Sequence, residues 1–260
     1  MYMKQRIEYI RSLPALSPEL LRKVSTFAND PEPPTPPGDI NDPAASITPD
    51  SMNIFMPGVS DSIISDVNLC KLVMQNAADC EFPDDSQIFE WFKFYINGLS
   101  TLGWVVQIRD LQEVTIKGVN LTMDQVALDV IKGLIGDKAT LLANLAKQVV
   151  NTVQKDEKLI TLFESNKKLG KQSKFNITPA WVDSSGQANM VLNCIFLDVQ
   201  ESTTGVLFWK TNKKSTVVKS GAMHTYLDNS LFNDLRGVLR EEFLGDAKSK
   251  IKNLPRLKKN

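Results

Sequence analysis

The stretch Ala188-Asn-Met-Val-Leu-Asn-Cys-Ile-Phe-Leu-Asp-Val199 decides the fold, because it is the most apolar run of the chain. An alternating apolar and polar run from Phe175 to Trp181 precedes it, and Asp183-Ser-Ser-Gly186 lies between the two. Alternation predicts a strand with one wet face, and a short polar segment ending in glycine predicts a tight turn. We therefore expect an antiparallel hairpin whose second strand is the more deeply buried one.

Two further strands are expected after this hairpin, at 206–210 and 216–226. Together they predict a mostly antiparallel sheet over about 172–227. Several amphipathic helices precede the sheet, and one more follows it at 228–252. Helices, then strands, then a covering helix are typical of an α+β fold rather than of alternating βαβ units. We predict a single α+β domain over residues 1–260.

The expected order of segments completes this domain. Residues 1–30 form an N-terminal helical segment, and residues 59–170 are mainly helical. Between them, residues 31–50 form a Pro-rich linker or strap, because proline lacks the N–H that helices and central strands need. Residues 253–260 form a basic tail.

Composition excludes several classes of protein. Lys and Arg number 30 and Asp and Glu number 30, so no global field attracts nucleic acid, and we expect no nucleic-acid partner. No window approaches 18 uninterrupted apolar residues, and the N-terminus lacks the apolar core of a secretory signal. Three scattered cysteines do not make a disulfide framework. We expect synthesis in a reducing compartment and, for any role outside the cell, export by a non-classical route.

Cys194 is the candidate site. Alternation along the strand places it on one apolar face with Met190, Leu192 and Phe196. A thiol in such surroundings is either an inert small core residue or the attachment point of a lipid. In the second case the three apolar neighbours are candidates for the lining of an acyl channel.

Catalytic and metal chemistry have weaker support. His224 is the single histidine, and a Cys194–His224 dyad with Asp198 is an alternative of the cysteine-hydrolase type. Apolar surroundings raise the pKa of a thiol and make it a poor nucleophile, so we predict no catalytic residues. The spacing of Cys70 and Cys80, without a nearby histidine, predicts no metal site. No cofactor other than a covalent acyl group is expected.

A long helical segment supports another alternative. Residues 131–153 are largely apolar and carry few charges, as in small pore-forming toxins that insert amphipathic helices. The same pattern is also that of a core helix with one polar face. A charged residue at Leu134 or Leu142 is expected to abolish liposome leakage if the toxin interpretation holds.

The order of the elements, the chain length and the segment Val-Leu-Asn-Cys194-Ile-Phe resemble the Erwinia virulence factor family, Evf. The resemblance implies a wound fold of helices and strands, and a palmitoyl thioester on the cysteine that corresponds to Cys194. It also implies a non-enzymatic bacterial virulence or host-persistence factor, made in the bacterial cytoplasm and directed to membranes. The partners implied are a fatty acyl chain and a host membrane.

Overall fold

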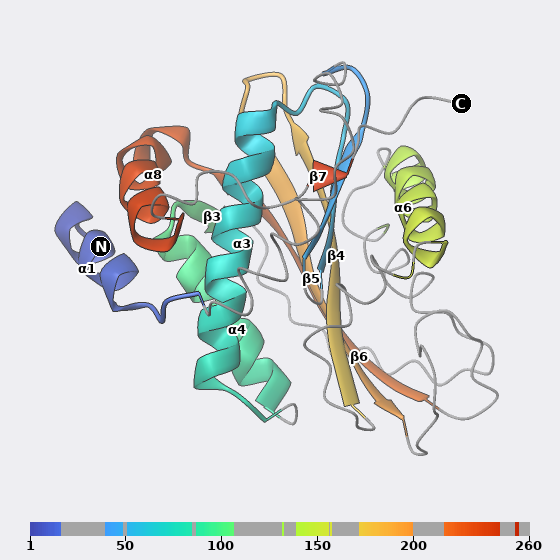
Figure 1. The fold of residues 1–260 in the computed structure, drawn as a ribbon, viewed down its shortest axis with the longest axis horizontal. Coiled ribbons are helices and arrows are strands. Elements are labelled where there is room, and N and C mark those ends of the chain that lie inside the picture. The colour runs from blue at the N-terminus through green and yellow to red at the C-terminus, as the bar shows by residue number, and fades with distance from the viewer. Residues whose placement is uncertain are drawn as a thin grey trace.

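A seven-stranded sheet lies between helices in this computed structural model (Figure 1). The structure describes residues 1–16, 40–48, 51–84, 87–106, 132, 139–155, 157, 172–199, 216–244 and 253–254. Its helices are α1 Met3–Ser12, α3 Asp61–Glu81, α4 Ile88–Thr101, α6 Ala139–Gln154 and α8 Asn229–Leu244. Its strands are β1 Ala44–Thr48, β2 Ser51–Phe55, β3 Trp104–Val106, β4 Gln172–Val182, β5 Ala188–Val199, β6 Thr216–Leu227 and β7 Asn253–Leu254.

The strand order is β3-β6-β5-β4-β2-β1-β7. Every described pair is antiparallel except β2 with β4, which are parallel. The predicted single α+β fold with a mostly antiparallel sheet is confirmed. The hairpin of β4 and β5 turns at the predicted place, where Gly186 has a φ of 81° that suits glycine.

The sheet continues beyond the span expected from the sequence. Residues 44–48 of the expected Pro-rich strap form β1, and residues 253–254 of the expected basic tail pair with β1 as β7. Ala44 to Thr48 contains no proline, so each of its residues keeps an N–H for the ladder. The expected strand at 206–210 and residues 158–170 of the expected helical segment lie outside the described residues.

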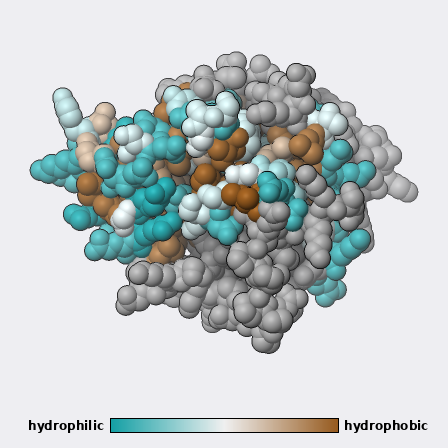
Figure 2. Space-filling view, turned by 90° about the horizontal axis from the view of Figure 1, so that it is seen from above, coloured by the Kyte–Doolittle hydropathy of each residue, from teal (hydrophilic) through white to brown (hydrophobic). Residues whose placement is uncertain are grey.

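Helices cover the two faces of the sheet differently. The paired helices α3 and α4 lie over one face, with α1 and α8 packed outside them, and α6 lies over the other (Figure 1). We call the face toward α3 and α4 the helical face. From above, the surface over α1 and α8 is mainly hydrophilic, and hydrophobic residues gather in smaller patches toward the middle (Figure 2). The buried apolar cluster of the described residues joins side chains of β5 to those of α3 and α4.

Polar contacts fix the helices of this layer to one another. Arg6 of α1 donates hydrogen bonds from Nη1 to the carbonyl oxygens of Ser100 (3.0 Å) and Thr101 (2.6 Å) at the end of α4. These carbonyls have no partner inside the helix, and a cation there also interacts favourably with the helix dipole. The N-terminal helix thereby serves as the C-terminal cap of α4.

Candidate functional site

Cys194 lies on β5 and contributes to the apolar cluster under α3 and α4. Met190 and Leu192 share its face and are completely buried, whereas Cys194 is 5% exposed. The structure thus brings together three of the four side chains that the sequence placed on one face. Phe196 follows on the same strand, but its side chain lies outside the described part of the chain.

Both flanks of Cys194 depart from a regular, filled sheet. On β6 its paired residue is Gly221, which has no side chain. On the β4 side the pairing with β5 runs to Phe175↔Ile195 and resumes only at Ala180↔Met190. The thiol therefore stands beside a glycine on one flank and beside an interrupted ladder on the other.

Asn193 fills that interruption. Its side chain accepts a hydrogen bond from the backbone N–H of Ile177 (3.0 Å) and donates one to the carbonyl oxygen of the same residue. The amide thereby replaces two ladder bonds, and Asn193 is completely buried. Pro179, which has no N–H to donate, lies in the same gap. The residue next to Cys194 thus holds β4 and β5 together where their backbones do not pair.

Two other polar groups lie in the cluster with Cys194. Burial raises the pKa of Tyr95 well above its usual range, and the thiols of Cys194 and Cys70 raise it further. Burial also raises the pKa of the Cys70 thiol to about 12. The side chain of Cys70 is thus a buried thiol that keeps its proton.

The structure overturns the cysteine-hydrolase alternative in its dyad form. His224 is paired in register with Val191, and Cys194 with Gly221. His224 lies three residues after Gly221 on β6, and side chains an odd number of residues apart point to opposite faces of a sheet. The side chains of His224 and Cys194 therefore lie on opposite faces. The Nε2 atom of His224 lies 3.1 Å from Oδ1 of Asn189, and its ring stacks on Trp181. The side chain of Asp198, the expected third member, lies outside the described part.

The cysteines of α3 do not share a site either. Cys70 is buried and Cys80 is exposed near the end of the helix. Within the described residues, no three His, Cys, Asp or Glu side chains are grouped so that they could hold a metal ion.

A buried polar cluster around Lys71 was missed by the sequence reasoning. Two rows of small polar side chains cross β1, β2 and β4 on the helical face, and α3 adds Asn68 and Lys71. The rows consist of Ser46, Asn53 and Thr178, and of Thr48, Ser51 and Asn176. The available signal was the alternation of Ser, Thr and Asn in 46–53, which resembles a loop composition when it is read without its partner strands.

Lys71 is held by neutral oxygen atoms. Its Nζ donates to Oγ of Ser51 (2.9 Å), to Oδ1 of Asn53 (2.6 Å) and to Oγ1 of Thr178. Burial lowers the pKa of Lys71 well below its usual value, because an ammonium group loses its hydration there. The amine of Lys71 therefore lies in a polar cluster in which no described carboxylate is its partner.

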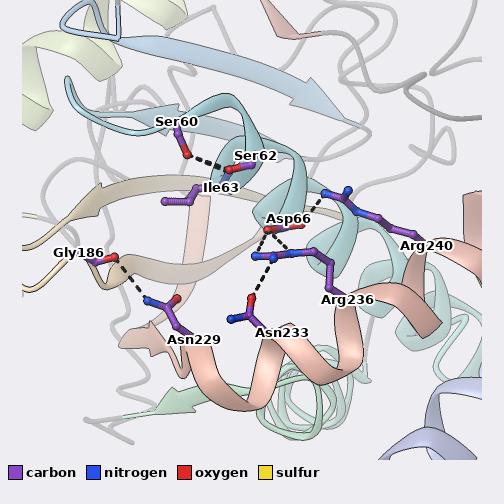
Figure 3. A network of polar contacts seen from close by, with 9 residues as sticks. All are labelled: Ser60, Ser62, Ile63, Asp66, Gly186, Asn229, Asn233, Arg236 and Arg240. Atoms are coloured by element: carbon purple, nitrogen blue, oxygen red, sulfur yellow. Dashed lines mark hydrogen bonds and ion pairs between the residues drawn. The ribbon is translucent and has the colours of Figure 1, made fainter.

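Asp66, five residues earlier on α3, joins that helix to α8 (Figure 3). Its carboxylate is 1% exposed and accepts from Nε of Arg236 (3.0 Å) and Nη2 of Arg240 (2.9 Å). Asn233 accepts a further hydrogen bond from Nη1 of Arg236 (2.9 Å). Two arginines one turn apart thus clamp a single buried carboxylate.

Comparison with known proteins gives only distant likenesses. No family model matches the chain, and no curated protein matches it. The solved structure of the Evf virulence factor is similar with a TM-score of 0.41 and 12% identity, over 76% of this chain and 85% of that chain.

Two toxin structures are also similar. Activated monomeric Cyt2Ba from Bacillus thuringiensis subsp. israelensis has a TM-score of 0.35 and 19% identity, over 70% of this chain and 97% of that chain. A delta-endotoxin has a TM-score of 0.38 and 15% identity, over 73% of this chain and 89% of that chain. All three scores lie below 0.5, so these likenesses assign neither family nor function.

Proposed function

We propose that the protein is a non-enzymatic virulence or host-persistence factor that carries a fatty acyl chain, of the palmitoyl type, as a thioester on Cys194. The observation that carries the proposal is the setting of the thiol on the helical face. Cys194 faces buried apolar side chains, pairs with Gly221 and adjoins the interrupted β4–β5 ladder. A linear hydrocarbon bound at this sulfur meets apolar side chains and no large residue on the paired position of β6.

The energetics favour a buried chain over an exposed one. Each CH₂ group removed from water contributes about 0.8 kcal/mol. Met190 and Leu192 flank the sulfur along the strand and are proposed, with Phe196, to line the path of the chain. If the acyl chain leaves this site and enters a bilayer, a single chain gives only reversible membrane binding. Reversible binding suits a protein that is directed to membranes and not inserted in them. Among the described helices, none combines the length and apolar character that crossing a bilayer requires.

The modification is a thioester exchange. The sulfur of Cys194 attacks the carbonyl carbon of an activated fatty acyl thioester, and the new C–S bond forms as the carrier's C–S bond breaks. The proton of Cys194 passes to the released carrier thiol, so neither oxidant nor reductant is needed. Cys70 is the poorer acceptor because its thiol is completely buried and has a pKa of about 12.

Intact-mass measurement tests this proposal. Protein from its bacterial host is expected to carry an acyl mass that hydroxylamine removes, because hydroxylamine cleaves thioesters. Cys194→Ala is expected to abolish the added mass, and the matched variant Cys80→Ala, at an exposed thiol, is expected to keep it. An unmodified wild-type mass, or an acyl group that survives in Cys194→Ala, would overturn the assignment.

A further inference from the structure

The hydroxyl of Tyr95 is a buried donor for which no described residue supplies a hydrogen-bond acceptor. The side chain is 1% exposed, so bulk water does not reach it. Buried hydroxyl groups nearly always have a partner, and one that lacks it marks either a cost to stability or the place of an absent group. Among the described residues, the Tyr95 hydroxyl is thus one of two unpartnered donors in the apolar cluster, and the other is the indole Nε1 of Trp104.

The position of this donor is fixed by aromatic packing. The Tyr95 ring stacks on Trp91, with ring centroids 5.1 Å apart and an interplanar angle of 18°, and on Phe92 at 6.4 Å. Trp91 is itself tied to α3, because its indole Nε1 donates to Oδ1 of Asp79 (2.8 Å). A phenol held in this way presents its hydroxyl group in one direction with little loss of side-chain freedom.

The same cluster contains the proposed attachment point. Tyr95 belongs to the same apolar cluster as Cys194 and Cys70. Both thiols act electrostatically on the phenol and raise its pKa, with Cys194 contributing more than Cys70. Since the pKa of Tyr95 is already raised by burial, the phenol keeps its proton at neutral pH and can donate it to an acceptor.

We propose that Tyr95 is a positioning residue for the acyl group, and that its hydroxyl donates a hydrogen bond to the carbonyl oxygen of the thioester on Cys194. This inference rests on the proposed function, because it needs the acyl group to be present. A thioester adds an acceptor to a cluster in which two donors lack one. The hydrogen bond fixes the orientation of the carbonyl, and thereby the direction in which the hydrocarbon leaves the sulfur.

The infrared band of the thioester carbonyl tests the inference. Protein is produced in bacteria fed palmitate labelled with ¹³C at its carbonyl carbon, and the label identifies the band. A hydrogen bond lowers the frequency of a carbonyl stretch, so the band of the wild type is expected to lie below that of a palmitoyl thioester in dry alkane. In Tyr95→Phe the band is expected to move up toward the alkane value. The matched variant Tyr9→Phe, whose hydroxyl lies 3.9 Å from the Met74 sulfur, is expected to leave it in place.

Each outcome bears on one proposal or on both. A wild-type band at the alkane frequency overturns the role of Tyr95 while the acyl mass still supports the proposed function. The same holds if the band of acylated Tyr95→Phe does not move. A wild-type protein without any labelled acyl band overturns both. Because the wild-type band is compared with the alkane standard, a wild-type band at the alkane frequency overturns the role of Tyr95 even if Tyr95→Phe fails to fold.

Discussion

Asn193 has a structural role that its place in an apolar strand conceals. Its amide takes the place of two missing ladder bonds between β4 and β5, directly beside the candidate thiol. No side chain without both a donor and an acceptor can do the same. The local shape of the sheet at Cys194 therefore depends on this one amide.

Replacing Asn193 by Ala is expected to destabilise the protein by about 2–4 kcal/mol, because a buried N–H and a buried carbonyl of Ile177 both lose their partner. The measurement is the free energy of unfolding from urea denaturation. Asn151→Ala, at an exposed position of α6, is the control and is expected to change it by less than about 0.5 kcal/mol. Equal effects of the two substitutions would contradict the role assigned to Asn193.

At the scale of elements, α3 carries both charged side chains of the described core, Asp66 and Lys71. One side of it presents Lys71 to neutral oxygens of the sheet, and another presents Asp66 to the arginines of α8. The sheet groups facing Lys71 are hydroxyls and amides, and the nearby carboxylate of Asp66 is engaged with α8. The helix is thus bound to its two neighbours by different kinds of interaction.

Lys71 predicts a pH dependence of stability. Its pKa is lowered on folding from an ordinary value of 10.5, so the unfolded chain binds a proton that the folded chain resists. As the pH falls below 10.5 the wild type therefore loses stability relative to Lys71→Met, by up to about 1.4 kcal/mol per pH unit. The loss stops growing once the pH passes below the folded pKa. Urea denaturation of both proteins at several pH values between neutral and 10.5 measures this difference.

The control for this series is Lys147→Met, at an exposed position of α6. Its charge is hydrated in both folded and unfolded chains, so its profile is expected to run parallel to that of the wild type. If Lys71→Met also runs parallel to the wild type, the amine of Lys71 does not change its protonation on folding as described.

The contact between α3 and α8 predicts an asymmetric response. Replacing Arg236 and Arg240 together by Ala leaves the carboxylate of Asp66 buried and unpaired, which costs about 3–5 kcal/mol. Asp66→Asn is expected to cost less, because the two arginines are 35% and 42% exposed and can be hydrated. Thermal unfolding compares the variants, and Glu241→Gln, exposed on α8, is the control. A larger loss of stability in Asp66→Asn than in the double arginine variant would show that the burial of Asp66 does not determine the cost of breaking this contact.

For the whole molecule, the pore-forming alternative needs a test that separates insertion from folding. Of the two leucines predicted to matter, Leu142 is 1% exposed on α6 and Leu134 lies outside the described residues. A charge at Leu142 unfolds the packing of α6 on the sheet and cannot report on membranes alone. Leu141 is 50% exposed, so Leu141→Lys leaves the fold intact.

The expected outcome follows from the proposed function. An acylated protein that only binds to membranes should release no dye from liposomes, in the wild type or in Leu141→Lys. Dye release by the wild type that Leu141→Lys reduces, with an unchanged unfolding temperature, would favour pore formation instead. Circular dichroism of both proteins provides the check on folding.

The hairpin, α3, α4 and the strand that became β6 could be predicted from the sequence, because their apolar periodicity is strong and local. The segment predicted to be mainly helical, 59–170, contains the helices Asp61–Glu81 and Ile88–Thr101. The strands β1 and β7 could not be predicted. β1 is a five-residue strand beside prolines, and β7 has two residues. Neither is long enough to show a periodic pattern, and both are defined by pairing with strands elsewhere in the chain.

The sequence by itself determined the α+β class and the apolar face of β5 on which Cys194 lies, since both follow from the spacing of apolar residues. Only the tertiary structure decided which groups meet there. It placed His224 on the opposite face, Gly221 beside the thiol and Tyr95 in the same cluster. It also joined Lys71 to a polar ladder built from three strands. The physical reason is that strand register and helix packing, which bring distant residues together, are fixed by long-range contacts and not by local periodicity.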